Sequence, residues 1–546
     1  MPFKDSIREL NRFRQIIDAI FKEGFGFIIY KIGFRNHLSL NLRLNKKKFE
    51  TPPDSIQIRL RKIMEDLGGT FIKLGQLLSL RPDLIPKEYA KEFSKLQDQV
   101  PPFSYEKVVE TIESELNANL KDVFLKFEKI PIASASIGQV HKAWLKDGKK
   151  VAVKVMRPKI EEVFETDIKI LYQLAELLET HYTELKEYDL LRIVKEFERY
   201  TKNELDYTKE AKNLEVFYNN FKKDRQIVIP KVFHNYTTKR VLVMEFIDGK
   251  KINEVEKSSA SRRLAVKLAM NSVLKQIFEL RYFHADPHPG NIFILKGNKI
   301  AFLDLGIVGR ISEEETYNTE NLFIALSYGD RNLLADSLMS LGFVDKKIDK
   351  EQFKRDLSEH LREYYDITLS QLHISEFLYD LLALTRKYKI KLIPDFVLLV
   401  KAAATLEGFV KDMDPEFNFV EAWKKYAKEI IKKRKSIGYQ KKEVLKIAYD
   451  FKRLLKDFPR EARDFLSSHD RMKVDMEEKV VNKLTFKFDT AMNRIAIGIV
   501  IAALIIAATI NFGKSESILN TSTLFLLIAV LLFIYLINSI SREREV

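Results

Sequence analysis

Four polar residues occur in the order that phosphoryl transfer requires. Lys154 ends the apolar run Val-Ala-Val-Lys, and Asp286 and Asn291 belong to the pattern His-x-Asp-x4-Asn. Asp304 follows as the first residue of Asp-Leu-Gly. In kinase-like sites a lysine holds the phosphates of ATP, an aspartate orients the acceptor, and an asparagine and a second aspartate hold Mg²⁺. We therefore predict a site for ATP and Mg²⁺, with Lys154 and Asp286 as catalytic residues and with Asn291 and Asp304 as metal ligands.

The segment that should cover the phosphates is rich in alanine rather than glycine. It consists of Ala133, Ser134, Ala135 and Ser136, followed by Ile-Gly-Gln-Val. Glycine lets backbone amides approach phosphate oxygens closely, and added methyl groups restrict that approach. We expect these four residues to contact the nucleotide, but in a manner that differs from a protein kinase.

Two further groups of polar residues have the spacing of functional sites. Asp206, Glu210 and Asn213 are spaced i, i+4 and i+7, which places them on one face of a helix. One of these carboxylates is expected to pair with Lys154, and a solvated helix face is the alternative. His284 and His288 also have the i, i+4 spacing of metal ligands, but the intervening and following prolines exclude the helix that would bring them together. A structural role is predicted for both histidines.

Strands and helices that could position these residues can be read from the local pattern. The turn Asp147-Gly148 lies between two apolar-rich runs and predicts a β-hairpin that carries Lys154. A later strand is expected at 240–246, and short strands are expected on either side of residue 297. Glu245 and Ile247, at the end of the 240–246 strand, are included among the expected nucleotide contacts. Helical periodicity dominates from Ser258 onward, so the chain passes from a small β-containing lobe to a larger helical lobe.

The first part of the chain is expected to be helical. Residues 56–84 form two helical stretches interrupted at Gly68 and Gly69, and Pro82 and Pro86 end the second. Residues 6–34 mix basic with aromatic and aliphatic side chains, as in a helix that lies on a membrane or a partner. A helix packed within the protein is the alternative.

Composition limits the classes of function. The chain has 546 residues, too many for one ordinary core, and it has no cysteine, which excludes disulfides, thiolate metal sites and cysteine nucleophiles. Its net charge of +15 is compatible with either nucleic acid or an anionic membrane surface as partner.

The C-terminal end favours a membrane. Ile495 to Phe512 carries no charge and would be about 27 Å long as a helix, and Leu519 to Ile540 is a second apolar segment beyond a polar turn. Lys and Arg residues flank the pair, so both ends are expected in the cytoplasm, and the charged N-terminus shows no secretory signal. A multi-pass protein of the cell membrane with a cytoplasmic body is therefore predicted, and a pair of buried helices in a soluble core is the alternative. No nucleic acid partner is expected.

Six motifs in order resemble the UbiB/AarF (Abc1-type) family of atypical kinases. They are Lys-Leu-Gly-Gln at 73–76, the Ala-rich segment, Val-Ala-Val-Lys, Glu-Leu-Asp-Tyr-Thr-Lys-Glu-Ala-Lys-Asn, His-Ala-Asp-Pro-His-Pro-Gly-Asn and Asp-Leu-Gly. The similarity spans roughly Ile56 to Tyr426. It implies an α+β, bilobal protein-kinase-like fold with an added helical extension whose K-x-G-Q motif covers the pocket that a protein substrate would occupy.

The resemblance also implies roles for several residues and a class of function. Lys73 and Gln76 would face the nucleotide, with Glu204 and Asp206 as their partners, and Glu210 would pair with Lys154. The family is associated with ubiquinone biosynthesis and isoprenoid-lipid handling, so membrane lipids, isoprenoid or quinone precursors and their biosynthetic enzymes are expected partners. The leading hypothesis is a membrane-anchored atypical kinase or ATPase. A small-molecule or protein kinase acting in trans and a pseudokinase scaffold are the alternatives.

These patterns divide the chain into six ranges. They are an N-terminal amphipathic segment at 1–50, the helical extension at 51–130, the N-lobe at 131–250, the C-lobe at 251–430, a charged helical connector at 431–492, and a two-helix transmembrane hairpin at 493–541.

Overall fold

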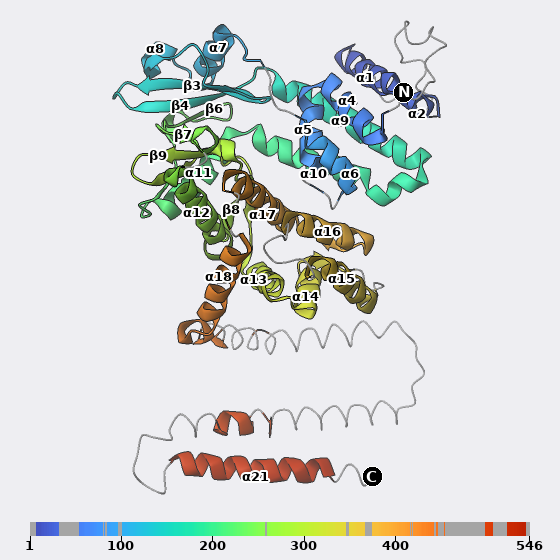
Figure 1. The fold of residues 1–546 in the computed structure, drawn as a ribbon, viewed down its shortest axis with the longest axis vertical. Helices are drawn as coiled ribbons and strands as arrows, with labels where there is room; N and C mark the ends of the chain where they lie inside the picture. The colour runs from blue at the N-terminus through green and yellow to red at the C-terminus, as the bar shows by residue number, and fades with distance from the viewer. Residues whose placement is uncertain are drawn as a thin grey trace. The chain divides into compact units, whose positions relative to one another are not determined.

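The chain forms two compact units, Met1–Lys435 and Ser436–Val546. The structure is a computed structural model, drawn in Figure 1. It describes residues 7–31, 54–79, 81, 84–96, 101–256, 259–344, 349–365, 374–414, 417, 419–441, 444–445, 453, 497–498, 500–505 and 521–541.

The N-lobe is an antiparallel sheet in the strand order β1-β3-β4-β6, with β2 paired to β3. The predicted hairpin is present, because β3 (Gly138–Leu145) and β4 (Lys150–Met156) pair on either side of Gly148, whose φ of 81° suits glycine. The other strands are β1 (Phe124–Phe127), β2 (Ala133–Ser134) and β6 (Val241–Glu245). Helices α7 (Tyr105–Leu116) and α8 (Leu120–Val123) share an apolar cluster with this sheet, so residues from the range assigned to the extension pack with the N-lobe.

Three helices follow β4 before the chain returns to the sheet. They are α9 (Ile160–His181), α10 (Leu190–Glu204) and α11 (Tyr207–Phe221), and a short 3₁₀ turn at Thr183–Tyr188 separates the first two. Asp206 caps α11, since its carboxylate accepts a hydrogen bond from the Thr208 amide. Helix α11 therefore begins at a fixed point and presents Glu210 one turn later.

The extension consists of α4 (Ile56–Leu67), α5 (Gly69–Ser79) and α6 (Lys87–Phe93). The predicted break is confirmed, because Gly68 has a φ of 67° between α4 and α5. Figure 1 shows these helices beside α9 and α10.

The N-terminal segment is a packing element, which is the second of the two expected alternatives. It comprises α1 (Ile7–Ile20), a π-helical turn at Phe21–Phe25 and α2 (Gly26–Lys31), and α1 contacts α4 and α9. Phe13, Ile16 and Ile17 are fully buried. Arg12 pairs with the buried Asp167 on α9 at 2.7 Å and donates to the carbonyl of Leu67 at 3.1 Å. These contacts tie α1 to the end of α4.

The C-lobe contains α12 (Ala260–Lys275) and a π-helical turn at Gln276–Leu280. Its strands are β5 (Ile227–Val228), β7 (Lys250–Lys251), β8 (Tyr282–His284), β9 (Ile292–Leu295), β10 (Lys299–Phe302), β11 (Val308–Arg310), β12 (Gly342–Phe343) and β13 (Lys391–Leu392). The order β5-β10-β9-β7 and the pair β11-β8 place the segments around Asp286 and Asp304 side by side.

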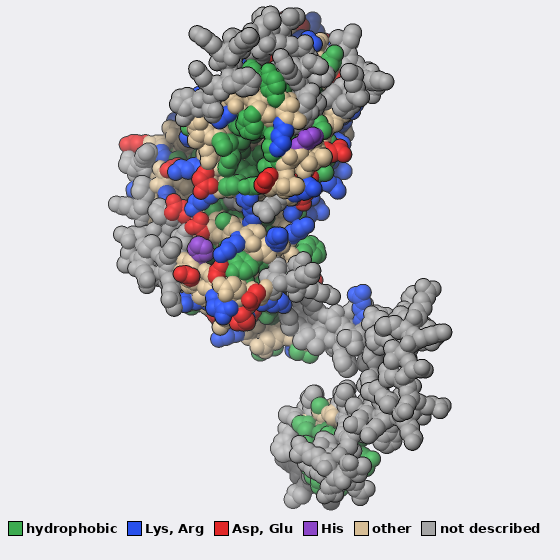
Figure 2. Space-filling model, turned by 90° about the vertical axis from the view of Figure 1, so that its right-hand side faces the viewer, with side chains coloured by type: hydrophobic (Ala, Val, Ile, Leu, Met, Phe, Trp, Pro, Cys, Tyr) green, Lys and Arg blue, Asp and Glu red, His purple; other side chains and the backbone are tan. Residues whose placement is uncertain are grey.

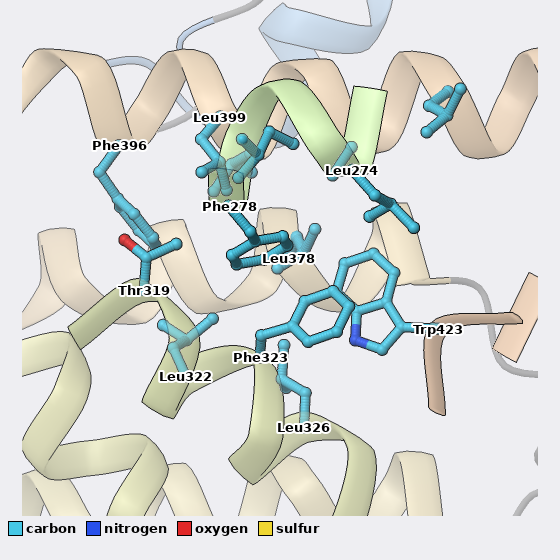
Figure 3. A pocket seen from close by; sticks show the side chains of 14 residues that line it. Leu274, Phe278, Thr319, Leu322, Phe323, Leu326, Leu378, Phe396, Leu399 and Trp423 are labelled. Carbon is cyan, nitrogen blue, oxygen red and sulfur yellow. The ribbon is translucent and has the colours of Figure 1, made fainter. Parts of the chain in front are cut away.

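The remaining C-lobe helices enclose an apolar core. They are α13 (Glu313–Tyr328), α14 (Arg331–Ser340), α15 (Lys350–Tyr365), α16 (Ile374–Lys387), α17 (Pro394–Met413) and α18 (Phe419–Arg434). Figure 3 shows a small pocket in this core, where the ring of Trp423 stacks on Phe323 with 4.1 Å between centroids. No charged side chain lines the pocket, so it offers no group for phosphate chemistry.

The described residues contradict the predicted transmembrane hairpin. Among them, no helix combines the length and the apolar composition that crossing a membrane requires. Helix α21 (Thr521–Ser541) covers most of the second predicted segment, but its uninterrupted apolar run extends from Leu524 only to Ile537. That run would be about 21 Å long, against a hydrocarbon core of about 30 Å. Only parts of the first predicted segment and of the connector fall within the described residues.

Candidate active site

Lys154 lies at the centre of a group of acidic side chains. Strand β4 presents its ammonium to both carboxylate oxygens of Glu210 on α11, at 3.0 and 2.8 Å. The Oδ2 atom of Asp304 lies 3.7 Å from the same nitrogen. The predicted pairing of Lys154 with Glu210 is therefore present, and it brings Asp304 into the same site from the other lobe.

The pKa values of these groups are shifted because one lysine lies among several carboxylates. Burial alone would lower the pKa of Lys154, but Asp304 and Glu210 outweigh burial and raise it well above its ordinary value. Burial raises the pKa of Glu210 to about 7, opposed by Lys154 and reinforced by Asp304. Lys154 lowers the pKa of Asp304, assisted by the amide of Gly306, which donates to Asp304 at 2.9 Å. Lys154 and Asp304 are thus charged at neutral pH.

Asn213 links helix α11 to the Asp-Leu-Gly segment. Its amide donates to the carbonyl of Leu305 at 2.9 Å, and its side-chain oxygen accepts from the hydroxyl of Tyr282. The helical face predicted from the spacing of Asp206, Glu210 and Asn213 thus joins parts of both lobes, although Asp206 itself serves as the helix cap.

The Ala-rich segment is held by backbone hydrogen bonds and by the side chain of Arg157. Ala133 and Ser134 form β2, and the amide of Ala135 donates to Gly138 at 2.8 Å to close a tight turn. Arg157 donates to the carbonyls of Ala135 at 3.2 Å and of Ser136 at 3.3 Å. Arg157 was not among the predicted site residues, because its contacts are with backbone atoms distant in sequence.

Asp286 lies on a loop whose backbone is held by hydrogen bonds. The amide of Ala285 donates to Ile307 at 3.0 Å, and His288 accepts from the amide of Gly290 at 3.1 Å. His284 is fully buried, with its Nδ1 3.5 Å from the Ile307 carbonyl, and burial lowers its pKa. Both histidines hold the loop, in agreement with the structural role predicted for them.

Asn291 and Asp304 are the residues that would hold Mg²⁺. The amide of Leu303 donates to the Asn291 carbonyl at 3.1 Å, which places the Asn291 residue beside the strand that leads to Asp304. Both side chains offer oxygen donors, as Mg²⁺ prefers. Within the described ranges, no group of three or more His, Cys, Asp or Glu side chains could hold a metal alone. A Mg²⁺ ion held here would therefore need ligands from a bound phosphate or from water.

The K-x-G-Q motif lies on α5. Lys73 pairs with Glu204 at the end of α10, as the resemblance implied. Gln76 donates to the carbonyl of Leu96 at 3.4 Å, so its amide contacts the extension itself. Glu245 ends β6 as an exposed residue, and Ile247 follows it as a half-buried one.

One residue beside Asp286 was missed by the sequence analysis. Lys401 on α17 is 2% exposed, and its Nζ lies 3.4 Å from Oδ2 of Asp286. A signal was available, because Lys401 is the one charged residue between Phe396 and Leu406, where every other residue except Thr405 is apolar. Buried lysines are rare unless they are paired.

Comparisons with known proteins match three parts of the chain. Family models match the chain as an ABC1 atypical kinase-like domain at residues 95–338, a UbiB helical domain at 357–418 and an ABC1/UbiB kinase-like C-terminal domain at 479–542.

Individual relatives extend the similarity. A Clostridium pasteurianum protein, "Uncharacterized protein in hydrogenase 1 5'region", is 31% identical over 97% of this chain and 99% of its own length. A Synechocystis protein, sll1770, is 32% identical over 68% of this chain and 64% of its own length. A solved structure of Rv3197 from Mycobacterium tuberculosis, in complex with erythromycin, is 23% identical with a TM-score of 0.45, and the match covers 65% of this chain and 93% of that one.

Proposed function

Because this chain belongs to the UbiB/ABC1 family of atypical kinase-like proteins, we propose that it binds ATP with Mg²⁺ and transfers the terminal phosphoryl group to water or to a small acceptor. One observation carries the proposal: a single lysine on β4 joins a carboxylate on α11 to the aspartate of Asp-Leu-Gly. Phosphoryl transfer depends on this clamp, because Lys154 positions phosphate oxygens while Asp304 and Asn291 hold the metal.

Each residue of the site has a defined task in this proposal. Lys154, oriented by Glu210, would contact phosphate oxygens, and bound Mg²⁺ would neutralise charge on the terminal phosphates. Asp286 is about one-third exposed, with a side-chain exposure of 38%, so it can accept a proton from an incoming hydroxyl or water. The Ala-rich segment, held by Arg157, would cover the phosphates from the N-lobe side.

We propose a small lipid-like acceptor, of the isoprenoid or quinone-precursor type that is associated with the family. The extension supports this choice, since the family resemblance implies that its K-x-G-Q motif covers the pocket that a protein substrate would occupy, and Lys73 of that motif pairs with Glu204 on α10. Water or a slender acceptor requires less room near Asp286.

Purified protein should be tested first for binding and then for turnover. MgATP should raise the melting temperature of the wild type, and Lys154→Ala or Asp304→Asn should abolish most of that increase. Lys239→Met serves as a matched control, because its ammonium pairs with Glu161 on the surface of the N-lobe. Equal stabilisation of all four proteins would refute the site.

Turnover is measured as phosphate release with and without liposomes and a quinone precursor. Release that depends on Lys154 and Asp304 supports the proposal. MgATP binding without any release under these conditions would contradict phosphoryl transfer and favour a nucleotide-binding scaffold.

A further inference from the structure

A buried lysine from the helical part of the C-lobe contacts the proposed catalytic aspartate. Lys401 lies in the middle of α17, with a side-chain exposure of 3%, and its ammonium is 3.4 Å from Oδ2 of Asp286. The two residues are far apart in sequence, so the contact depends on how α17 packs.

Several contacts fix α17 against the catalytic segments. Asp395 in its first turn accepts a hydrogen bond from the amide of Arg310 at 2.9 Å, at the end of β11. Strand β11 pairs with β8, which leads directly into Asp286. Lys401 also lies close enough to the buried His284 to influence its protonation. The packing of α17 against β11 therefore places Lys401 beside Asp286.

Stability does not account for a lysine at this position. Burial of an ammonium group is costly, and an apolar side chain in its place would suit the surrounding run of Val, Ala and Leu. The acid recorded within ion-pair distance of Lys401, among the described residues, is Asp286.

The other cations of the site have different partners. Lys154 pairs with Glu210 and Asp304, and Lys73 pairs with Glu204. The loop from Asp286 to Asn291 contains no Lys or Arg. Positive charge next to Asp286 is thus supplied by α17.

We propose that Lys401 is the positioning residue of Asp286. Its ammonium holds Oδ2 and leaves Oδ1 free to receive the proton of the acceptor hydroxyl. As that proton moves to Asp286, the acceptor oxygen bonds to the terminal phosphorus, and the bond from phosphorus to the bridging oxygen breaks, with its electron pair leaving on ADP. The inference rests on the proposed function, since it assigns a role within phosphoryl transfer.

A double-mutant cycle tests this role in the full chain. Steady-state ATP turnover is measured for the wild type, Lys401→Met, Asp286→Asn and the double variant. Lys401→Met should lower kcat by roughly 10- to 100-fold and change KM for ATP by less than about twofold, because Lys401 contacts Asp286 rather than the nucleotide clamp. The double variant should be no slower than Asp286→Asn alone.

Lys387→Met is the matched control. Lys387 lies in the last turn of α16, is 65% exposed and pairs with Asp356 at 2.7 Å, and its loss should leave kcat unchanged. If Lys401→Met does not fold, as judged from its melting temperature, Lys401→Gln replaces it with the same expectation.

The possible failures can be distinguished. An active wild type whose kcat is unaffected by Lys401→Met overturns the role of Lys401 alone, as does a double variant in which the two losses multiply. A wild type that binds MgATP but shows no turnover overturns the proposed function, and the role of Lys401 falls with it.

Discussion

Glu210 is the residue of the site whose charge is most sensitive to pH. It is buried beside one lysine, and Asp304 and Glu204 add further negative charge. Burial raises its pKa from 4.5 to about 7, so in the nucleotide-free protein it exchanges a proton near neutrality. Positive charge from a bound metal would favour the ionised form.

The raised pKa predicts how stability depends on pH. Between pH 4.5 and about 7, folded Glu210 keeps a proton that the unfolded chain has released, so the folded state binds more protons. The contribution of Glu210 to the free energy of unfolding therefore falls as pH rises through this window, and the contribution is constant above about pH 7. In the Glu210→Gln variant, the side chain at position 210 cannot titrate.

Thermal unfolding of the nucleotide-free proteins measures this effect. The melting temperature of the wild type minus that of Glu210→Gln should decrease from pH 4.5 to about 7. The other groups titrate in both proteins, so this difference reports the titration of Glu210. A difference that stays constant or rises across this range would contradict the assignment.

At the scale of elements, α1 is joined to α9 by an ion pair whose acidic residue is buried. Asp167 is fully buried, and Arg12 donates to its two oxygens at 2.7 and 3.0 Å. Breaking a buried pair by removing one charge leaves the other uncompensated, which costs about 3–5 kcal/mol.

Asp167→Asn should accordingly lower the free energy of unfolding by an amount of that order, measured by denaturant titration. Lys169→Met on the same helix is the control, because Lys169 is 67% exposed and its pair with Glu9 is 3.4 Å long. Exposed pairs contribute about 1 kcal/mol or less. Equal effects of the two substitutions would show that the buried pair does not hold α1.

Local elements could be predicted from the sequence because local chemistry determines them. The turn at Asp147-Gly148 forms the β3–β4 hairpin, and Gly68 separates α4 from α5, as the pattern indicated. The pairing of Lys154 with Glu210 followed from helical spacing together with the family resemblance. Such features depend on neighbours along the chain or on motifs whose order is specific.

Long-range contacts could not be predicted in the same way. Lys401 and Arg157 act on residues that only packing brings near, and a single sequence contains no record of that packing. Predictions made from apolar composition also had two different outcomes. At the N-terminus it reflected packing against α4 and α9, and at the C-terminus it led to a transmembrane hairpin that the described residues do not support.

At the scale of the whole kinase-like unit, the extension is attached to both lobes. Lys87 on α6 pairs with Asp380 on α16 at 2.8 Å, and Arg81 pairs with Glu196 on α10 at 3.2 Å. Figure 2 shows both signs of charge interspersed on one face of this unit, so the net positive charge of the chain is not gathered there into one patch.

This attachment predicts poor phosphorylation of proteins in trans. The family resemblance implies that α5 covers the pocket of a protein substrate, so wild-type protein with labelled ATP should place little label on a generic protein substrate. Phosphate release measured in the same reactions provides the positive control. Strong labelling that Asp286→Asn abolishes would show that the extension leaves the cleft open.

The pair between Arg12 and Asp167 also has a consequence for synthesis of the chain. Its two residues are 155 positions apart, so α1 emerges from the ribosome long before α9 exists. At about 5–20 residues per second, the delay is roughly 8–30 s. During that time α1, whose Phe13, Ile16 and Ile17 are fully buried in the finished protein, lacks its contacts with α9. The nascent chain therefore exposes an aggregation-prone apolar surface that a cellular chaperone is suited to shield until α9 has been made.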